Sequence, residues 1–233
     1  MSTEASNNST LAPHSEVEPS LVLDSVSCER GERLLVADLS LHLVASQGVR
    51  IEGPNGSGKT TLLRVLAGLS QQYSGTVHWY GIDIRQSRSS LAEDTLYIGD
   101  LAGVKALLSP LENLSWWASL HISSGDAVSK AKLLAALSQV GLERFANTPC
   151  HQLSAGQQRR IALARLYLSE HRLWILDEPF TAIDATGVEL LEHRIAEHLK
   201  KGNMAIVTTH QAMQIDGFTR CPLTSASSEE EAS

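Results

Sequence analysis

Residues 53–61 of the chain read Gly53-Pro54-Asn55-Gly56-Ser57-Gly58-Lys59-Thr60-Thr61. This stretch fits the phosphate-binding pattern G-x-x-x-x-G-K-[ST] at every fixed position. Residues 49–52 before it predict a short buried strand, and residues 60–69 after it predict a helix with leucines at helical spacing. A strand, a glycine-rich loop and a helix start place several backbone N–H groups at the positive end of a helix dipole. The sequence therefore predicts a phosphate-binding loop, in preference to a chance match in a turn.

The loop also carries two side chains of defined chemistry. Lys59 is predicted to reach the β- and γ-phosphates of a nucleotide, and the Thr60 hydroxyl is predicted to ligate Mg²⁺. Glycine permits backbone conformations and a close approach to phosphate that a Cβ atom would block. We expect all of residues 53–61 to contribute to nucleotide binding.

The bulk properties exclude several classes of protein. The chain has 233 residues, enough for one large domain or one domain with an inserted lobe, and its net charge of −7 argues against a general nucleic-acid-binding protein. The three cysteines are far apart and indicate neither a zinc site nor a disulfide framework. No apolar run approaches the ~20 residues that span a bilayer, and no signal-peptide pattern is present. We therefore expect any membrane role to come through a partner.

Polar composition and strand patterns divide the chain into segments. Residues 1–19 and 223–233 are polar and predict a disordered N-terminal extension and an acidic disordered tail. Short apolar runs at 21–23, 34–43, 76–80 and 95–98 predict strands. We expect these strands to form an antiparallel β subdomain around the phosphate-binding loop.

A mostly helical insert is predicted at about 104–150. Ser109, Pro110 and Glu112 form a helix start with a capping box, and a second helix is predicted at about 126–140, ended by Gly141. The pair Trp116-Trp117 has two interpretations. One is a contact with haem or a membrane, and the favoured one is a core residue beside a partly exposed residue.

Two acidic residues follow the apolar run at 173–176, which predicts an inner parallel strand. Ligand sites in open α/β sheets form at the carboxyl ends of such strands. Asp177 is predicted to hold Mg²⁺ through water, opposite Thr60. Glu178 is the predicted general base for an attacking water. His210 follows a further predicted strand at 204–207, where it could contact the γ-phosphate, so Lys59, Glu178 and His210 are the predicted catalytic residues.

A second anion-binding element is predicted at residues 154–160. Ser154 is the expected N-cap of a helix, with Gln157 closing a capping box, and Asp184 is the expected cap of another helix. One chain cannot easily enclose one nucleotide with two helix starts, whereas two copies related by a two-fold axis can. We therefore expect the nucleotide to lie between two copies of the chain. The alternative for 154–160 is a plain helix cap.

The order of these motifs resembles the ATP-binding cassette (ABC) family. The resemblance covers about residues 21–212 and implies a P-loop α/β core with a mostly parallel central sheet, an antiparallel β subdomain and an inserted helical subdomain, over residues 20–222. It implies ATP and Mg²⁺ as cofactors. It also implies that a second ATPase copy contacts the nucleotide through Ser154, Gly156, Gln157 and Asp184, and that the chain pairs with integral membrane transporter subunits.

Within the family, the stretches at 152–166, 173–184 and 208–211 look like the ATPase subunits of cytochrome c maturation, the haem-exporter type. This likeness implies a peripheral subunit on the cytoplasmic face of a bacterial inner membrane. The subunit would power a step in attaching haem to periplasmic cytochromes. No residue identifies haem as the transported molecule.

The chain departs from the family pattern at two positions. Leu101 stands where the family normally has a glutamine, and leucine cannot ligate a cation or orient water, although neighbouring Asp100 could substitute. Arg30 stands near the expected position of the aromatic residue that stacks on adenine. A guanidinium can also stack on a base, so we expect weaker selectivity for adenine with binding retained.

Three other functions were weighed. A soluble regulatory or repair ATPase of the same superfamily usually carries coiled-coil insertions, a tandem cassette or a basic face, which this chain lacks. A P-loop kinase or GTPase leaves residues 154–160 and His210 unexplained. A binding module that does not hydrolyse ATP stays open because of Leu101.

Overall fold

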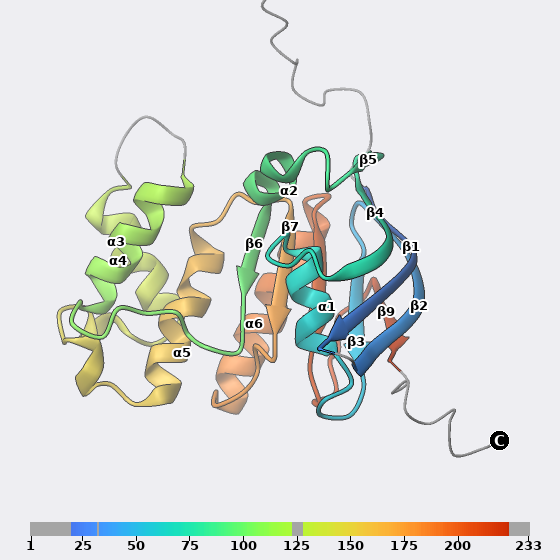
Figure 1. Ribbon diagram of the computed structural model, residues 1–233. Helices are drawn as coiled ribbons and strands as arrows, with labels where there is room; N and C mark the ends of the chain where they lie inside the picture. The colour runs from blue at the N-terminus through green and yellow to red at the C-terminus, as the bar shows by residue number, and fades with distance from the viewer. Residues whose placement is uncertain (1–19, 32, 123–127, 224–233) are drawn as a thin grey trace, which may run out of the picture.

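The computed structural model describes residues 20–31, 33–122 and 128–223. The predicted extension at 1–19, and the predicted tail apart from Leu223, lie outside these residues. The described chain is α/β, with two sheets and several layers of helices, as the sequence predicted (Figure 1). Within these ranges, every helix is too short or too polar to span a lipid bilayer.

The larger sheet has five strands in the order β6-β7-β8-β3-β9, all paired in parallel. Every residue of the two central strands β7 and β8 is buried, which explains their uninterrupted apolar runs. The sequence did not predict β9. The five strands are β3 (Gly48–Glu52), β6 (Thr95–Ile98), β7 (Leu173–Asp177), β8 (Met204–Thr208) and β9 (Phe218–Pro222).

The smaller sheet is antiparallel and has four strands in the order β2-β1-β4-β5. The strand at 95–98 was wrongly predicted to belong to it. This strand is β6, and it pairs in parallel with β7 through Thr95 and Leu173 at one end and Ile98 and Leu176 at the other. The strands of the smaller sheet are β1 (Ser20–Arg30), β2 (Arg33–Val44), β4 (Tyr73–Trp79) and β5 (Ile82–Asp83).

Two helices cover opposite faces of the parallel sheet. Helix α1 (Lys59–Leu66) lies between the two sheets, where Leu62 and Leu63 share one buried cluster with residues of β1, β2 and β3 (Figure 1). Helix α6 (Ala185–Lys200) packs through Leu191 and Ile195 into a second cluster, together with residues of β7 and β8. The phosphate-binding loop at the start of α1 is therefore anchored by both sheets. The short helix α2 (Arg88–Asp94) precedes β6.

The helical part contains α3 (Pro110–His121) and α4 (Lys130–Gln139). The predicted capping box of α3 is present, because Ser109 N donates to Glu112 Oε2 at 2.8 Å and Glu112 N donates to Ser109 Oγ at 3.3 Å. Residues 126–127 of the second predicted helix lie outside the described chain, and α4 begins at Lys130. Trp117 is 4% exposed and Trp116 is 45% exposed, so the predicted division into a core and a surface tryptophan is confirmed.

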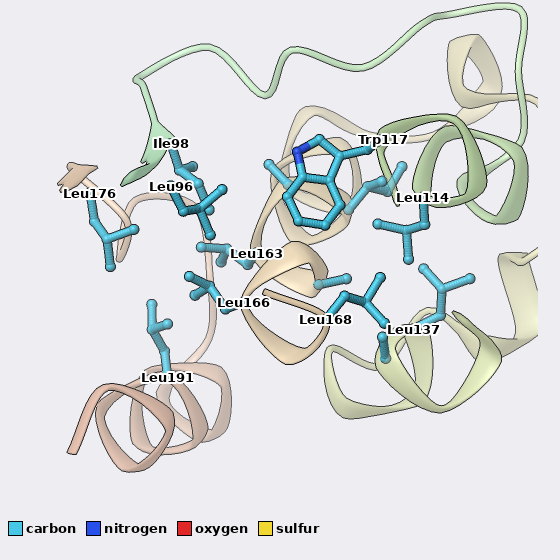
Figure 2. Packing of buried hydrophobic residues seen from close by; sticks show 14 of the residues in the cluster. Leu96, Ile98, Leu114, Trp117, Leu137, Leu163, Leu166, Leu168, Leu176 and Leu191 are labelled. Carbon is cyan, nitrogen blue, oxygen red and sulfur yellow. The ribbon is translucent and has the colours of Figure 1, made fainter. Parts of the chain in front are cut away.

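Helix α5 (Ala155–Ala164) and the 3-10 helix Arg165–Tyr167 connect this helical part to the sheet. Figure 2 shows Leu163 and Leu166 between Leu96 of β6 and the helices that carry Trp117 and Leu137. Two shorter 3-10 helices, Glu143–Phe145 and Cys150–Gln152, precede α5. The three cysteines are buried and free, consistent with the absence of a disulfide framework from the sequence.

Candidate active site

The phosphate-binding loop links the end of β3 to the start of α1. Gly58 is the N-cap of α1 and has φ +92°, a left-handed conformation that favours glycine. A Cβ atom at this position would lie 2.9 Å from both Cβ of Leu35 and Cγ2 of Val36 on β2. Glycine therefore allows the loop to pack directly on the antiparallel sheet.

Lys59 is buried and folds back over the loop that precedes it. Its Nζ donates to the carbonyl of Gly53 at 2.7 Å and to the carbonyl of Pro54 at 3.1 Å. An ammonium group has three N–H donors. Two of these hold the loop in shape, and the third remains available to an anion.

Asp177 at the end of β7 joins three elements through its carboxylate. Oδ2 accepts a hydrogen bond from Thr60 Oγ1 at 2.7 Å, and Oδ1 accepts one from Thr208 Oγ1 at 2.6 Å. Because Thr60 donates its proton to Asp177, the oxygen lone pairs of Thr60 can still face a cation. The structure thus brings the two predicted Mg²⁺ residues together. Thr208 was not predicted, although its position at the end of an apolar strand was a signal.

Glu178 adopts a left-handed backbone conformation, with φ +47°. Its N–H donates to Thr208 Oγ1 at 2.9 Å and to the Thr208 carbonyl at 3.1 Å. A non-glycine residue in this region is strained, and such residues cluster at functional sites. The buried Oε1 atom of Glu178 lies 3.3 Å from Nε2 of His210, and as a carboxylate oxygen it can accept a proton from a bound water.

His210 connects Glu178 with the phosphate-binding loop. Its Nε2 atom lies 3.3 Å from Glu178 Oε1 and 3.2 Å from Asn55 Oδ1. The structure therefore places all three predicted catalytic residues, Lys59, Glu178 and His210, around one loop.

A cavity of about 420 Å³ opens beside these residues. Most of the predicted site contributes to its lining, including Arg30 and both acidic residues. Arg33 and Leu35 also line it and were not predicted, and Asp100 lines it in place of the missing glutamine. The lining consists of Arg30, Arg33, Leu35, Asn55, Gly56, Gly58, Lys59, Thr60, Thr61, Asp100, Asp177 and Glu178.

Arg30 and Arg33 are paired across the tip of the hairpin formed by β1 and β2. Both line the cavity at its end near β2, so two guanidinium groups are available there. Leu101 is 80% exposed, and its side chain carries no polar atom. Both departures from the family pattern are therefore located at or beside the cavity.

The residues predicted to act on a second copy lie together outside the cavity lining. The capping box of α5 is present, because Ser154 N donates to Gln157 Oε1 at 2.9 Å and Gln157 N donates to Ser154 Oγ at 3.2 Å. A Cβ atom at Gly156 would lie 2.8 Å from the Ala182 carbonyl, so the start of α5 packs against the loop that leads to Asp184.

Asp184 caps α6, as predicted, by accepting a hydrogen bond from Gly187 N at 3.0 Å. Its Oδ2 atom lies 3.2 Å from Arg160 Nη2. The Gly187 hydrogen bond and the charge of Arg160 lower the pKa of Asp184, so this residue is a stable anion beside the start of α5.

Comparison with known proteins identifies the family. Residues 36–181 match the model of the ABC transporter family. The chain belongs to this family and is an ATP-hydrolysing subunit of the ABC transporter class.

Curated relatives cover most of the described chain. The sequence is 49% identical over 195 residues to the cytochrome c biogenesis ATP-binding export protein CcmA of Pseudomonas fluorescens, covering 84% of this chain and 90% of the relative. It is 50% identical over 188 residues to the protein of the same name from Escherichia coli, covering 81% and 87%.

Solved structures share the fold. A putative ABC transporter ATP-binding protein from Pyrococcus furiosus superposes with a TM-score of 0.75 at 24% identity, covering 88% of this chain and 97% of that chain. A dimeric ATP-binding cassette in a post-hydrolysis state, bound to ADP and Pi, superposes with a TM-score of 0.73 at 25% identity, covering 85% and 96%. The predicted ABC ATPase fold is therefore confirmed.

Proposed function

We propose that this chain is the energy-coupling ATPase subunit of an inner-membrane ABC transporter complex for c-type cytochrome biogenesis, acting in the export or handling of haem. The proposal is supported by two relatives that are 49% and 50% identical to this chain. The matched region covers 90% and 87% of the length of these relatives. It rests on one observation in the structure: Thr60, Asp177 and Glu178 line one cavity, and His210 lies 3.3 Å from Glu178 Oε1.

ATP occupies this cavity with its phosphates on the loop at 53–61. The third N–H of Lys59 and the backbone N–H groups at the start of α1 bind the β- and γ-phosphates. Arg30, with Arg33 beside it, stacks on the base. Mg²⁺ would be held by the Thr60 hydroxyl and, through water, by Asp177, which fits because these two side chains already touch. The bound ion neutralises developing charge on the phosphates.

Glu178 acts as the general base. Its Oε1 atom, 3.3 Å from Nε2 of His210, accepts the proton of the attacking water, and the hydrogen bond from Glu178 N to Thr208 Oγ1 holds the backbone in place. His210 lies against both Glu178 and Asn55, so it contacts the γ-phosphate from the side of the loop.

The complete site needs partners. A second copy supplies Ser154, Gly156, Gln157 and Asp184, which in one chain lie outside the cavity lining. Integral membrane subunits bind the chain on the cytoplasmic face of the inner membrane. Exposed apolar side chains at Leu101, Leu107 and Trp116 support such a contact.

Replacing the general base tests the enzymatic part of the proposal. We expect Glu178→Gln to bind ATP with unchanged affinity and to hydrolyse it at least about 100-fold more slowly, because the amide cannot accept the proton. Phosphate release measures the rate. Glu189→Gln, an exposed residue of α6, is the matched control and should hydrolyse ATP at the normal rate. Equal rates in the two variants would exclude Glu178 as the base.

A cellular experiment tests the pathway. We expect deletion of the gene to abolish haem attachment to periplasmic c-type cytochromes, measured by haem staining after electrophoresis. The normal chain should restore attachment, and Glu178→Gln should not. Fully haem-loaded cytochromes in the deletion strain would contradict the proposed pathway and leave the ATPase activity standing.

A further inference from the structure

Arg159 is a buried cation that the site described above does not use. It lies on α5 and is only 5% exposed. Among the described residues, its guanidinium forms no salt bridge and donates only to backbone carbonyls. Burying a guanidinium without a carboxylate partner is costly, and this burial lowers the pKa of Arg159. An apolar side chain would fill the same space at lower cost, so the charge calls for a functional explanation.

The four carbonyls form two pairs. Nη2 donates to Asp177 O at 2.6 Å and to Glu178 O at 3.2 Å, which belong to the peptide groups on either side of Glu178 Cα. Nη1 donates to Gly99 O and, at 3.3 Å, to Asp100 O, which belong to the peptide groups on either side of Asp100 Cα. One guanidinium therefore binds the backbone on both sides of Glu178 and of Asp100. Both of these acidic residues line the cavity described above.

The hydrogen bonds from Arg159 offset the strain in the Glu178 backbone. Glu178 is held at φ +47°, a left-handed backbone conformation that is strained for a residue with a side chain. Hydrogen bonds from a charged donor are about twice as strong as neutral ones. The hydrogen bond that Arg159 donates to Glu178 O, and the one that Glu178 N donates to Thr208 Oγ1, stabilise the conformation in which Glu178 lines the cavity.

Arg159 also contacts the loop that follows β6. Leu101 adds no polar atom to this loop, but backbone carbonyls of the loop accept hydrogen bonds from two arginines. Arg159 holds the loop at Gly99 and Asp100, and Arg165 holds it again by donating to Gly103 O at 2.9 Å. Both arginines belong to the segment that links the helical part to the sheet, Arg159 to α5 and Arg165 to the 3-10 helix that follows it.

We propose that Arg159 is a positioning residue for ATP hydrolysis. Its guanidinium fixes the peptide groups around Glu178 and Asp100 relative to α5, so both carboxylates face the bound nucleotide only when α5 is in place. The inference rests on the proposed roles of Glu178 and of the start of α5. It adds a connection inside one chain between these two parts of the site.

Arg159→Met tests the proposal because methionine keeps the unbranched inner part of the side chain and removes every side-chain donor. We expect kcat to fall about 10- to 100-fold, as a small misplacement of a catalytic group produces, while KM and the Kd for ATP change less than about threefold. Arg159 does not contact the loop at 53–61, so binding is spared. Arg159→Lys should give an intermediate kcat, because an ammonium can replace some of the four hydrogen bonds.

Arg194→Met is the matched control. Arg194 on α6 is half-buried and also donates to a backbone carbonyl, that of Leu166 at 2.8 Å, but it does not line the cavity. We expect this variant to keep a normal kcat. Hydrogen exchange at residues 99–103 should accelerate in Arg159→Met and stay unchanged in Arg194→Met.

The outcomes separate the two proposals. An inactive normal chain would refute the proposed ATPase, whatever Arg159 does. An active normal chain with equal kcat in Arg159→Met, or with equal losses in Arg159→Met and Arg194→Met, would refute the positioning role alone. If Arg159→Met does not fold, Arg159→Lys decides: a reduced kcat at unchanged Kd supports the role, and a normal kcat refutes it.

Discussion

Leu101 sits directly after Asp100, at the edge of the cavity, and its side chain points an apolar group at solvent. We expect Leu101→Gln to raise the rate of ATP hydrolysis severalfold, because an amide can ligate a cation and orient water. Phosphate release at saturating Mg·ATP measures the change. Leu107→Gln, an equally exposed leucine outside the cavity lining, is the control and should not change the rate.

An unchanged rate in Leu101→Gln would point to Asp100. If Leu101→Gln hydrolyses ATP no faster than the normal chain, another polar group already serves the site. Asp100 is then the candidate, since it lines the cavity and Arg159 fixes its backbone. Asp100→Asn would in that case lower the rate, whereas it should have little effect if Leu101 is the limiting residue.

Among the helices and strands, the features that were predicted correctly are those that depend on residues close together in the sequence. The capping residues Ser109, Ser154 and Asp184 all cap the expected helices, because a cap depends only on residues two or three positions away. The phosphate-binding loop and the strand that ends at Asp177 were predicted for the same reason. The prediction that one of Trp116 and Trp117 is a core residue and the other is partly exposed was also correct.

Features that depend on distant pairing were missed. The strand at 95–98 was given to the wrong sheet, because four apolar or β-branched residues do not specify which neighbour they pair with. Thr208 and Arg33 join the site only because β8 and the β1–β2 hairpin bring them beside Asp177 and Arg30. The role of Arg159 depends on four carbonyls that are 18 to 60 positions away in sequence.

The packing of α6 on the sheet predicts a dependence of stability on pH. His198 is 3% exposed, stacks on Trp174 of β7 at 3.6 Å, and has Nε2 3.1 Å from the Met204 carbonyl. Burial lowers the pKa of His198 to about 3 from its usual 6.5. The unfolded chain therefore binds the proton first. The stability contributed by neutral His198 is complete above pH 6.5 and is lost as the pH falls toward 3.

Urea unfolding measures this effect. Between pH 7 and pH 5, we expect the free energy of unfolding to fall by about 2 kcal/mol because of His198 alone. In His198→Phe, which can stack on Trp174 but cannot titrate, the fall should be smaller by that amount. The other histidines are common to both proteins and cancel in the comparison. Equal pH dependence in the two chains would show that His198 is protonated as easily in the folded state as in the unfolded state.

For the whole molecule, different elements of one chain form the cavity and the start of α5. The phosphate-binding loop contributes to the cavity lining, and the first turn of α5 has backbone N–H groups without a helical acceptor, as every helix start does. A second copy in two-fold symmetry can bring the start of its α5 to the γ-phosphate bound in the first. On the proposal that two copies enclose ATP, the site of one chain is half of a functional site.

We therefore expect Glu178→Gln to form a dimer with Mg·ATP, because ATP joins the two copies and its slow hydrolysis keeps them together. Light scattering should give twice the monomer mass with Mg·ATP and the monomer mass with Mg·ADP.

Adding Lys59→Ala to this variant should weaken ATP binding at least about tenfold, through loss of a charged hydrogen bond, and prevent the dimer. Adding Ser154→Arg should leave ATP binding intact and also prevent the dimer, because the bulky cation lies at the start of α5. A dimer that survives Ser154→Arg would place the contact between copies on another surface.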